Sequence, residues 1–339
     1  MRDTQREKVV LGLSGGVDSS VAACLLREKG FEVLGLFLDI GDAGAREAAA
    51  NAAGSLGIEL EVCDIREELE EHVCGPFARA YLCGQTPNPC VMCNPAVKFR
   101  NLIRAADRRG ARFIATGHYA RAEQGRILRG LPANDQSYML CRLLPEQAER
   151  LLLPLGGCEK KEVRRLAERY GLVNASRPDS MEICFIPDRD YAAWLAGRCP
   201  VPGPGPILWN GRQVGVHEGI HRWTVGQRLP GLYDGRKLYV SRIDAENSRI
   251  IADVWEELFT RELSVRDLRW LIPEPASPIR ASVQVRHTRW ERPECTVYPS
   301  GENARIECDS PLRAPAPGQA AALYDGDRLI GGGWIDPET

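Results

Sequence analysis

The sequence predicts an α/β protein with a doubly wound parallel sheet, a Rossmann-like arrangement, followed by a small β-rich central domain and a C-terminal β-barrel. Two observations predict this order. Up to about residue 198, apolar runs typical of buried strands alternate with helix patterns. Beyond that point, short strands follow one another between Gly, Asn and Asp turns. We therefore expect three domains, with the bounds 1–198, 199–258 and 259–339.

The first half contains four strand patterns, at 8–14, 31–40, 58–65 and 112–120. Helix patterns lie between and after them, at 21–30, 45–57, 66–82 and 96–109, and through the segments EQAERLLL and KKEVRRLAERYG. In such a sheet, ligands bind at the carboxyl ends of the strands. The segment SGGVDSS, the residues after Leu38 and the segment TGHY all follow strands, so we expect the binding site there.

The second half begins with the run CPVPGPGP at 199–206. Its prolines and glycines are incompatible with a helix or a central strand, so it is predicted to be a linker. Strand patterns then recur from ILWNGRQVGVHEG to AALYDGDRLIGGGWI, with the short spacing typical of a small barrel.

The composition excludes some classes of protein. The chain of 339 residues has a net charge of −2, and it contains no apolar stretch approaching the ~18 residues of a membrane-spanning helix. Its N-terminus lacks the apolar run of a signal peptide, so a cytoplasmic location is predicted. In that reducing compartment, the 12 cysteines favour buried, catalytic or metal-binding roles over a disulfide framework.

Basic residues gather in two places. On charge pattern alone, the simplest interpretation of both is a solvated surface. The first is a run that consists of Lys98, Arg100, Arg104, Arg108, Arg109, Arg112, Arg121, Arg126 and Arg129, and the second is a cluster of Arg280, Arg286, Arg289 and Arg292.

The segment SGGVDSS follows the first strand and opens a helix. Glycines there let backbone N–H groups close around phosphate oxygens, and a helix N-terminus favours anions. The segment matches neither the Walker A loop nor the dinucleotide fingerprint. A plain glycine turn would not require three serines and an aspartate. We predict a nucleotide loop in which Asp18 holds Mg²⁺ or orients the loop, and which is formed by Gly12, Leu13, Ser14, Gly15, Gly16, Val17, Asp18 and Ser19.

The segment TPNPCVMCN at 86–94 places Cys90 and Cys93 close together, with two residues between them. Pro87 and Pro89 predict a non-helical loop here. The spacing fits a disulfide, half of a zinc site, a redox pair or part of an iron–sulfur cluster, and it also fits two thiols without a function.

SGGVDSS is similar to the PP-loop of the ATP pyrophosphatases, which cleave ATP between the α- and β-phosphates and transfer AMP to a substrate oxygen. Further segments follow in order along nearly the whole chain: TPNPCVMCN with VKF, ATGHYAR, NDQSYML, RPDSMEICFIP, HRWTVGQRLPG, LYVSRID and PGQ. Together they resemble the bacterial tRNA-specific 2-thiouridylases. The resemblance implies an ATP-dependent tRNA sulfurtransferase that replaces O2 of the wobble uridine by sulfur and releases AMP and pyrophosphate.

The resemblance also implies roles for individual residues. ATP would lie on residues 12–19, with Leu38 and Gly117 beside the adenosine. Leu38 departs from the methionine that is frequent in the family, although a main-chain contact would survive the change. The tRNA would contact Asn88, Pro89, Cys90, His118, Asn134, Asp135, Gln136, Arg286, His287 and Gln319. The two basic groups would then act as a phosphate track, which makes binding sensitive to salt.

For the sulfur, the resemblance implies that Cys184 carries a persulfide whose terminal sulfur attacks the adenylated uridine. Cys93 would then form a disulfide with Cys184, which a reductant must open after each turnover. A basic surround would lower the pKa of these thiols. The sulfur donor would be sulfide, a cysteine desulfurase or a sulfur-relay protein.

Cys90 departs from the family pattern, which has aspartate at this position. Other PP-loop tRNA thiolases hold a 4Fe–4S cluster with a CxxC pair and one distant cysteine. One hypothesis is therefore that Cys90, Cys93 and Cys184 ligate such a cluster, and that sulfur passes from an iron-bound sulfide. The alternatives are a bystander role for Cys90 in a persulfide enzyme, a zinc site completed by Cys74 or Cys83, and a Cys90–Cys93 redox pair.

Two other functions explain parts of the sequence. An amide-forming PP-loop ligase acting on a small molecule would need an ammonia source or an amidotransferase domain, and this chain has no recognisable one. A non-catalytic RNA-binding module would explain the β-rich half but not the PP-loop.

Overall fold

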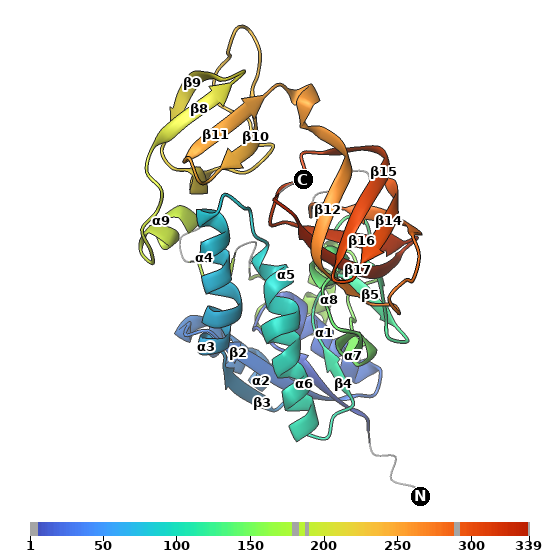
Figure 1. Ribbon diagram of the computed structural model, residues 1–339. Helices are drawn as coiled ribbons and strands as arrows, with labels where there is room; N and C mark the ends of the chain where they lie inside the picture. The colour runs from blue at the N-terminus through green and yellow to red at the C-terminus, as the bar shows by residue number, and fades with distance from the viewer. Residues whose placement is uncertain (1–5, 178–182, 187–189, 288–291, 338–339) are drawn as a thin grey trace, which may run out of the picture.

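A computed structural model of the chain describes residues 6–177, 183–186, 190–287 and 292–337. Within these residues the strands form three sheets, with five, four and eight strands. Figure 1 shows the first sheet and its helices in the lower half, and the two other sheets lie side by side above it. None of the helices in the described part is both long and apolar enough to cross a membrane.

The five-stranded sheet is parallel and has the strand order β3-β2-β1-β4-β7. Its strands are β1 (Lys8–Gly12), β2 (Glu32–Asp39), β3 (Leu60–Asp64), β4 (Phe113–Ala115) and β7 (Leu151–Leu152). The central strand β1 pairs with both β2 and β4, and its three middle residues are buried, as expected of a strand covered on both faces. The predicted doubly wound parallel sheet is confirmed.

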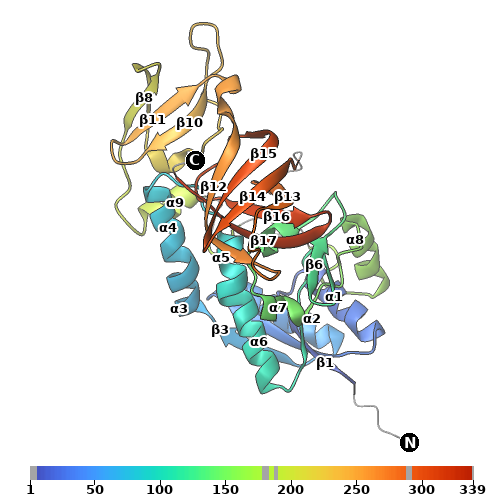
Figure 2. The same ribbon diagram turned by 45° about the vertical axis from the view of Figure 1, so that its right-hand side comes forward.

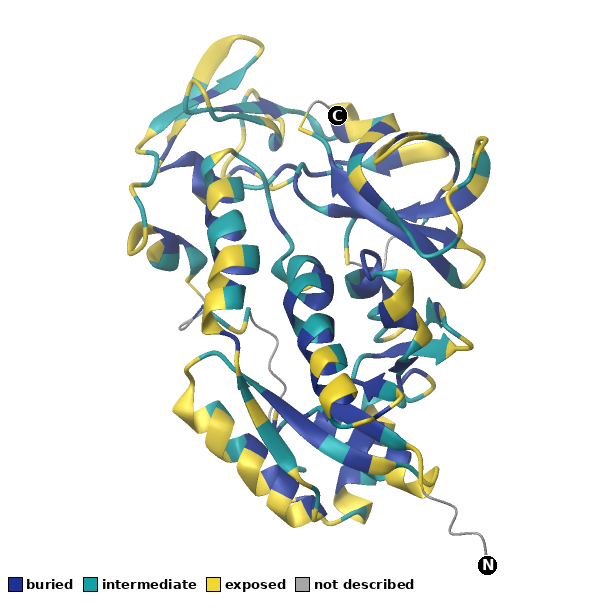
Figure 3. Ribbon diagram, turned by 60° about the horizontal axis from the view of Figure 1, so that its bottom comes forward, coloured by how far each residue is buried: buried dark blue, intermediate teal, exposed yellow. Residues whose placement is uncertain are grey.

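Helices cover both faces of this sheet because successive side chains of a strand point to opposite sides. Val10 belongs to an apolar core with Leu102 of α6, whereas Val9 belongs to a second core with Val21 of α1. In Figure 3, the dark blue strands lie beneath helices whose outward residues are yellow. The helices of this unit include α1 (Val17–Glu28), α2 (Ala43–Leu56), α6 (Phe99–Arg108), α7 (Pro145–Glu149), α8 (Lys160–Arg169) and the 3₁₀ helix η3 (Ser137–Leu140).

Two long helices contain π-helical turns. One consists of α3 (Arg66–Leu69), η1 (Glu70–Cys74) and α4 (Gly75–Leu82), and the other of α5 (Pro89–Cys93), η2 (Asn94–Lys98) and α6. The predicted non-helical loop is wrong from Pro89 onward, because helix α5 begins there. The Asn88 side chain accepts the Val91 backbone N–H at 3.3 Å and caps the helix, and proline is favoured in a first turn.

Two further segments differ from the prediction. Leu151 and Leu152 were expected in a helix, but they form β7 at the edge of the parallel sheet. The chain after β4 does not continue as one strand, since β5 (Ala120–Glu123) and β6 (Arg126–Arg129) form a hairpin that pairs with β17 of the eight-stranded sheet. Both differences arise because the pairing partner lies far away in the sequence.

The four-stranded sheet lies at the top of Figure 1 and has the order β10-β11-β8-β9. It is formed by β8 (Gly205–Trp209), β9 (Arg212–His217), β10 (Tyr239–Asp244) and β11 (Arg249–Asp253). Along the chain, α9 (Tyr191–Ala196) precedes β8, the 3₁₀ helix η5 (Ile220–Arg222) lies between β9 and β10, and the 3₁₀ helix η6 (Trp255–Leu258) follows β11. The predicted linker ends earlier than expected, because β8 includes Gly205 and Pro206. Pro206 lies opposite Val216, beyond the residues of β8 that pair with β11, so its missing N–H is tolerated.

The eight-stranded sheet contains a closed antiparallel barrel of six strands, as predicted. These are β12 (Phe259–Trp270), β13 (Ile279–Gln284), β14 (Glu294–Ser300), β15 (Asn303–Arg313), β16 (Ala320–Asp325) and β17 (Arg328–Ile335). Strand β12 pairs with both β15 and β17, which closes the barrel. Gly333 allows this closure, since a Cβ atom there would lie 2.5 Å from Val265 Cγ1.

The barrel packs directly on the α/β unit, and Figure 2 shows it above α5 and β6. Ala320, Tyr324 and Trp334 of the barrel belong to the same apolar core as Val10 and Phe99 of the α/β unit. The Tyr138 hydroxyl donates to the Ala320 carbonyl at 2.9 Å within this interface. A continuous apolar interface holds the barrel in a defined position beside the carboxyl ends of the parallel strands.

Candidate active site

The predicted nucleotide loop joins β1 to α1 and depends on Gly15. This residue has φ of +76°, and a Cβ atom there would lie 2.5 Å from the Ala48 carbonyl carbon. Gly16 precedes α1 without a side-chain cap, so the first N–H groups of this helix are not satisfied by a capping side chain. The loop therefore presents a helix N-terminus that can bind an anion.

The serines of the loop form hydrogen bonds inside it. The Gly16 N–H donates to Ser14 Oγ at 3.3 Å, and the Ser19 and Ser20 hydroxyls donate to the Gly16 carbonyl at 3.0 and 3.1 Å. The serine hydroxyls thus hold the loop in shape. The backbone N–H groups are consequently the main donors that the loop can offer to a phosphate.

Asp18 has two partners that the sequence alone did not indicate. Lys160 Nζ donates to both carboxylate oxygens of Asp18 at 2.7 Å, and the Tyr119 hydroxyl donates to one of them at 2.7 Å. Lys160 is the first residue of α8, which follows β7. A lysine that begins a helix after a strand of the same parallel sheet was the available signal, but only the fold shows that it reaches the loop.

The predicted adenosine contacts lie at the neighbouring strand ends. Leu38 is near the end of β2 and packs against the apolar clusters that contain Val91 and Val97. Gly117 follows β4, and a Cβ atom there would lie 3.1 Å from the Asp18 carbonyl carbon, which is a tight contact with the nucleotide loop. Gly117 therefore adjoins the nucleotide loop, and Leu38 lies at the carboxyl end of the strand next to β1, where a ligand of a parallel sheet is expected.

The thiols lie on separate elements around one cation. Cys90 and Cys93 are in α5, with Cys90 exposed and Cys93 half-buried, and Cys184 is in the described segment 183–186. Lys98, at the end of η2, acts electrostatically on both Cys93 and Cys184. Cys90 also acts on both of these thiols, and Cys184 acts on Cys93. The structure thus brings together the two cysteines that the family pattern implied.

The expected lowering of the thiol pKa values is wrong. Burial raises the pKa of Cys93 to about 11, although the Lys98 ammonium and the Lys98 backbone N–H both lower it. Burial likewise raises the pKa of Cys184, against Lys98 and two backbone N–H groups. One cation and a few N–H donors do not offset the desolvation of a thiolate here.

A fourth thiol lies beside this pair. Cys74 is buried at the end of η1, in the apolar cluster against which Cys93 and Phe185 pack. Burial is the main cause that raises the pKa of Cys74 to about 12, and Cys184 and Cys93 add to it. Cys83 is different, because it lines a cleft with Pro87 and Met92 on another side of α4.

The described residues form no preformed site for a single metal ion. Within the described ranges, no group of three or more His, Cys, Asp or Glu side chains lies close enough together to hold a metal ion. Adding Cys74 or Cys83 therefore does not complete a zinc site within these ranges. The cysteines of a 4Fe–4S cluster each bind a different iron, so a cluster held by Cys90, Cys93 and Cys184 stays a prediction.

The segment that leads to Cys184 is tied to the nucleotide loop. Asn174 Nδ2 donates to the Gly15 carbonyl at 2.8 Å and to Ser20 Oγ at 2.9 Å. Arg177 reaches the same Gly15 carbonyl at 3.4 Å. These bonds hold residues 174–177 against the nucleotide loop.

The predicted tRNA contacts in the α/β unit already have partners in the protein. His118 Nδ1 and Thr116 Oγ1 form a hydrogen bond of 2.7 Å, and the His118 ring stacks on Phe99. Burial holds the pKa of His118 well below the usual range. A neutral, apolar-packed imidazole can still contact an RNA base, but it contributes no charge.

The loop 134–136 is held by its own polar groups. The Asn134 amide donates to a backbone carbonyl of the loop before α8 at 3.1 Å. Asp135 pairs with Arg292 of the barrel at 3.1 Å, and the Gln136 side chain accepts the Tyr119 backbone N–H at 3.0 Å. These bonds shape the loop, and contact of the three residues with tRNA remains a prediction.

Several other predicted contacts meet around Tyr138. The Gln319 amide donates to the Thr86 carbonyl at 2.8 Å, and its oxygen lies 3.5 Å from the Tyr138 hydroxyl. The ring of His287 lies 6.2 Å from that of Tyr138, and Asn88 Nδ2 lies 3.8 Å from the sulfur of the next residue, Met139. Pro89 and Cys90 follow Asn88 in the first turn of α5, so loop and barrel residues do converge here.

Arg286 has a structural position. Its guanidinium donates to the carbonyls of Val225 and Ala314 at 2.7 Å each, which joins the four-stranded sheet to the barrel. In the same cluster, Arg280 pairs with Asp309 at 2.5 Å, and Arg289 lies outside the described residues. This cluster is thus largely used inside the protein.

Most arginines of the first basic run also have carboxylate partners. These pairs fit the simpler expectation of a solvated surface better than a free phosphate track. They join Arg104 to Glu68, Arg108 to Glu61, Arg109 to Glu59 and Glu61, Arg112 to Glu7, and Arg121 to Asp327 and Glu123.

The chain matches three domain families. These are described as the tRNA methyl transferase HUP domain over residues 7–188, the tRNA methyl transferase PRC-barrel domain over 194–252 and the aminomethyltransferase beta-barrel domain over 260–335. Among solved structures, NMN synthetase from Francisella tularensis is 18% identical with a TM-score of 0.36, over 52% of this chain and 67% of that one.

Curated relatives match along their whole length. The chain is 39% identical to the tRNA-specific 2-thiouridylase MnmA of Geobacter metallireducens, over 99% of this chain and 98% of that one. It is 40% identical to the protein of the same name from Syntrophotalea carbinolica, over 98% and 99% of the two chains. This chain therefore belongs to the family of tRNA-specific 2-thiouridylases.

Proposed function

We propose that this protein is an ATP-dependent tRNA sulfurtransferase that converts the wobble uridine to 2-thiouridine. One observation carries the proposal: Lys98 acts electrostatically on both Cys93 and Cys184, and Asn174, which precedes Cys184 in the chain, donates a hydrogen bond to the nucleotide loop. A PP-loop alone would suit many enzymes that adenylate a substrate. The thiols favour sulfur transfer over the methyl transfer that the names of two of the matching domain families suggest.

The nucleotide loop would bind ATP through the N-terminus of α1. Mg²⁺ is held by one or two carboxylates together with phosphate oxygens, so Asp18 fits as its protein ligand. When bound, the ion would neutralise charge on the departing pyrophosphate. Lys160 would then leave Asp18 and turn to a phosphate oxygen, since its ammonium already lies at the loop.

The first step would activate the uridine. Its O2 attacks the α-phosphorus of ATP, the bond to the β-phosphate breaks, and pyrophosphate leaves. In the O2 adenylate, AMP is the leaving group at C2. Without adenylation the uridine oxygen could not leave. The uridine must leave its stack to reach these groups.

The second step would deliver sulfur from a Cys184 persulfide. Its terminal sulfur attacks C2 and AMP departs with O2, which leaves C2 bonded through sulfur to the Cys184 sulfur. The Cys93 thiolate attacks that Cys184 sulfur, the bond to the uridine sulfur breaks, and a Cys93–Cys184 disulfide forms. A dithiol reductant then restores both thiols with two electrons and two protons.

The pKa of Cys93, raised by burial to about 11, makes proton loss a requirement of this second step. Lys98 supports the thiolate through its ammonium and through its backbone N–H. Lys98 is therefore a positioning residue, whose positive charge favours the thiolate form of both Cys93 and Cys184.

The persulfide route needs no iron–sulfur cluster, and a cluster ligated by Cys90, Cys93 and Cys184 is the alternative to it. The alternative can be tested directly. Protein purified and reconstituted without oxygen would be analysed for iron and sulfide, and then for thiolation. An iron-free enzyme with full activity supports the persulfide route, as does a fully active Cys90→Asp variant, whereas activity that depends on bound iron would overturn it.

The sulfur donor would be a cysteine desulfurase or a sulfur-relay protein, whose persulfide passes its outer sulfur to the Cys184 thiolate and keeps its own thiol, or it would be sulfide. Sulfide would form the persulfide by attacking Cys184 in the Cys93–Cys184 disulfide, so that the disulfide is the oxidant and the Cys93 thiolate leaves. A tRNA substrate is consistent with a cytoplasmic location. Incubation with each donor class followed by mass spectrometry of Cys184 would identify which one forms the persulfide. A donor that supports thiolation without any mass increase on Cys184 would contradict the persulfide route.

The decisive measurement is release of AMP and pyrophosphate with and without tRNA, together with nucleoside analysis for 2-thiouridine. We expect release that depends on tRNA and on ATP. Release without tRNA would favour the amide-forming ligase that acts on a small molecule. No release, with tRNA still bound, would favour a non-catalytic RNA-binding module.

A further inference from the structure

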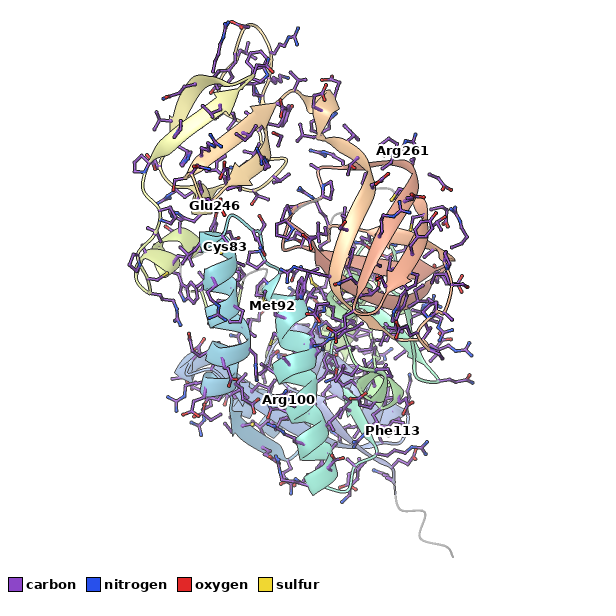
Figure 4. All side chains as sticks on the ribbon, viewed as in Figure 1. Cys83, Met92, Arg100, Phe113, Glu246 and Arg261 are labelled. Atoms are coloured by element: carbon purple, nitrogen blue, oxygen red, sulfur yellow. The ribbon has the colours of Figure 1, made fainter. Side chains whose placement is uncertain are left out.

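A cleft of about 320 Å³ lies between α4, the chain that precedes α5, and the barrel. Met92 and Trp334 contribute to its apolar walls, and its charged residues are Arg79, Arg266 and Asp267. In Figure 4, the labelled Cys83 and Met92, both lining residues, lie at the ends of α4 and α5 that are nearest the two β units. None of the roles assigned above uses this cleft.

The charges of the cleft are unbalanced. Asp267 is neutralised by Arg142, whose guanidinium is buried and lies 2.5 Å from the Asp267 carboxylate. Arg79 and Arg266 have no carboxylate partner within the described residues, and the nearest polar contact of Arg266 is Gln85 Oε1 at 3.5 Å. The arginines of α6 differ, because there Arg104, for example, is paired with a carboxylate.

Two uncompensated guanidinium groups beside apolar walls favour an anionic ligand. Low-dielectric walls focus the field of the charges, and guanidinium groups match the geometry of phosphate oxygens. Arg79 is exposed and Arg266 half-buried, so both can exchange water for such a ligand.

The position of the cleft points to RNA as the source of the phosphate. Pro87 in its lining precedes Asn88, and Gly318 precedes Gln319. Asn88 and Gln319 are the two residues at which the α5 end and the barrel are predicted to meet the tRNA. A strand that follows this surface would carry a backbone phosphate past the cleft.

We propose that Arg79 and Arg266 form a subsite for one backbone phosphate of the bound tRNA, between α4 and the barrel. This inference rests on the proposed function, because it assumes that tRNA is the ligand. The acidic surface of a sulfur-donor protein is the competing occupant, and the test separates the two.

The test measures the affinity of the full-length protein for a tRNA transcript across a series of salt concentrations. For the double variant Arg79→Gln and Arg266→Gln, we expect binding about tenfold weaker near 0.15 M salt. The slope of log K against log salt should fall in magnitude by about 1, the value for one phosphate. The single variant Arg79→Gln, on the exposed face of a helix, should show part of both effects.

The control is Arg104→Gln, which changes the net charge by the same amount as the single variant Arg79→Gln but removes an arginine that already has a partner. Its slope should equal that of the unmodified protein. An unchanged slope in the double variant overturns the subsite, and if sulfur transfer from a protein donor is then impaired, the cleft binds that donor instead. Failure of the proposed function would appear separately, as unmodified protein that releases no AMP with tRNA.

Discussion

The nucleotide loop and the thiol site are built in opposite ways. The loop is one run, residues 12–19, shaped by bonds between near neighbours such as the one from Ser19 to Gly16. The thiol site consists of Cys93 in α5, Lys98 in η2 and Cys184 in the segment 183–186. Cys93 and Cys184 are far apart in the sequence, so only packing of the folded chain brings them together. Substitutions in the loop should therefore act on ATP, and substitutions in the thiol site should act on sulfur transfer.

The largest effect should come from Cys184→Ser. The hydroxyl cannot carry a persulfide, so 2-thiouridine formation should fall by roughly 1,000-fold or more, whereas tRNA-dependent pyrophosphate release should fall far less. Nucleoside mass spectrometry and a pyrophosphate assay on the same samples measure both. The control is Cys24→Ser, a partly buried cysteine of α1 outside the thiol site. Equal losses of pyrophosphate release and of 2-thiouridine formation would show that the nucleotide loop and the thiol site cannot be separated by mutation.

The next effect should come from Gly15→Ala. The positive φ and the contact at 2.5 Å require the loop to shift, which we expect to cost about 1–3 kcal/mol and to weaken ATP binding. Denaturant unfolding and calorimetric titration with ATP measure the two. Gly54→Ala is the matched control: Gly54 lies in α2 with nothing within 4 Å of the added Cβ, so this change should stabilise by about 0.5–1 kcal/mol. Unchanged ATP affinity in Gly15→Ala would mean that the loop tolerates the methyl group.

A smaller loss should follow from Lys160→Met. The variant leaves Asp18 without its ammonium partner and removes the cation that would turn to the phosphates, so pyrophosphate release should fall about 10- to 100-fold. Lys160→Arg should restore part of it. The neighbouring exposed Lys161, changed to Met, serves as the control. If Lys160→Met lowered thiolation but spared pyrophosphate release, Lys160 would belong to the thiol site instead.

The smallest effect is on the pH dependence of the reactivity of Cys93. Because the pKa of Cys93 is raised to about 11, its thiolate fraction should increase about tenfold for each pH unit below that value. Lys98 lowers this pKa, so Lys98→Met should raise it further and slow iodoacetamide modification of Cys93 severalfold near pH 8. Peptide mass spectrometry follows Cys93, and Cys24 of the same protein is the internal control. A profile that does not move would show that Lys98 has no part in thiolate formation.

Much of the fold was predictable because it rests on local patterns. Alternating apolar runs and helix patterns predicted the parallel sheet, and SGGVDSS predicted its nucleotide loop, since glycine turns and helix starts depend on adjacent residues. The helical start at Pro89 could also have been predicted, because Asn88 is a capping residue and proline suits a first turn.

The sequence by itself determined the order of the elements, the nucleotide loop and the family motifs that single out Cys93 and Cys184. Only the tertiary structure decided that Lys160 reaches Asp18, that Cys74 lies beside the thiols, and that the β5–β6 hairpin joins the barrel sheet. It also decided which arginines have carboxylate partners, and so left Arg79 and Arg266 as the pair that faces a cleft. The physical reason is sequence separation: ion pairs, desolvation and strand pairing depend on groups that meet only after the chain has folded.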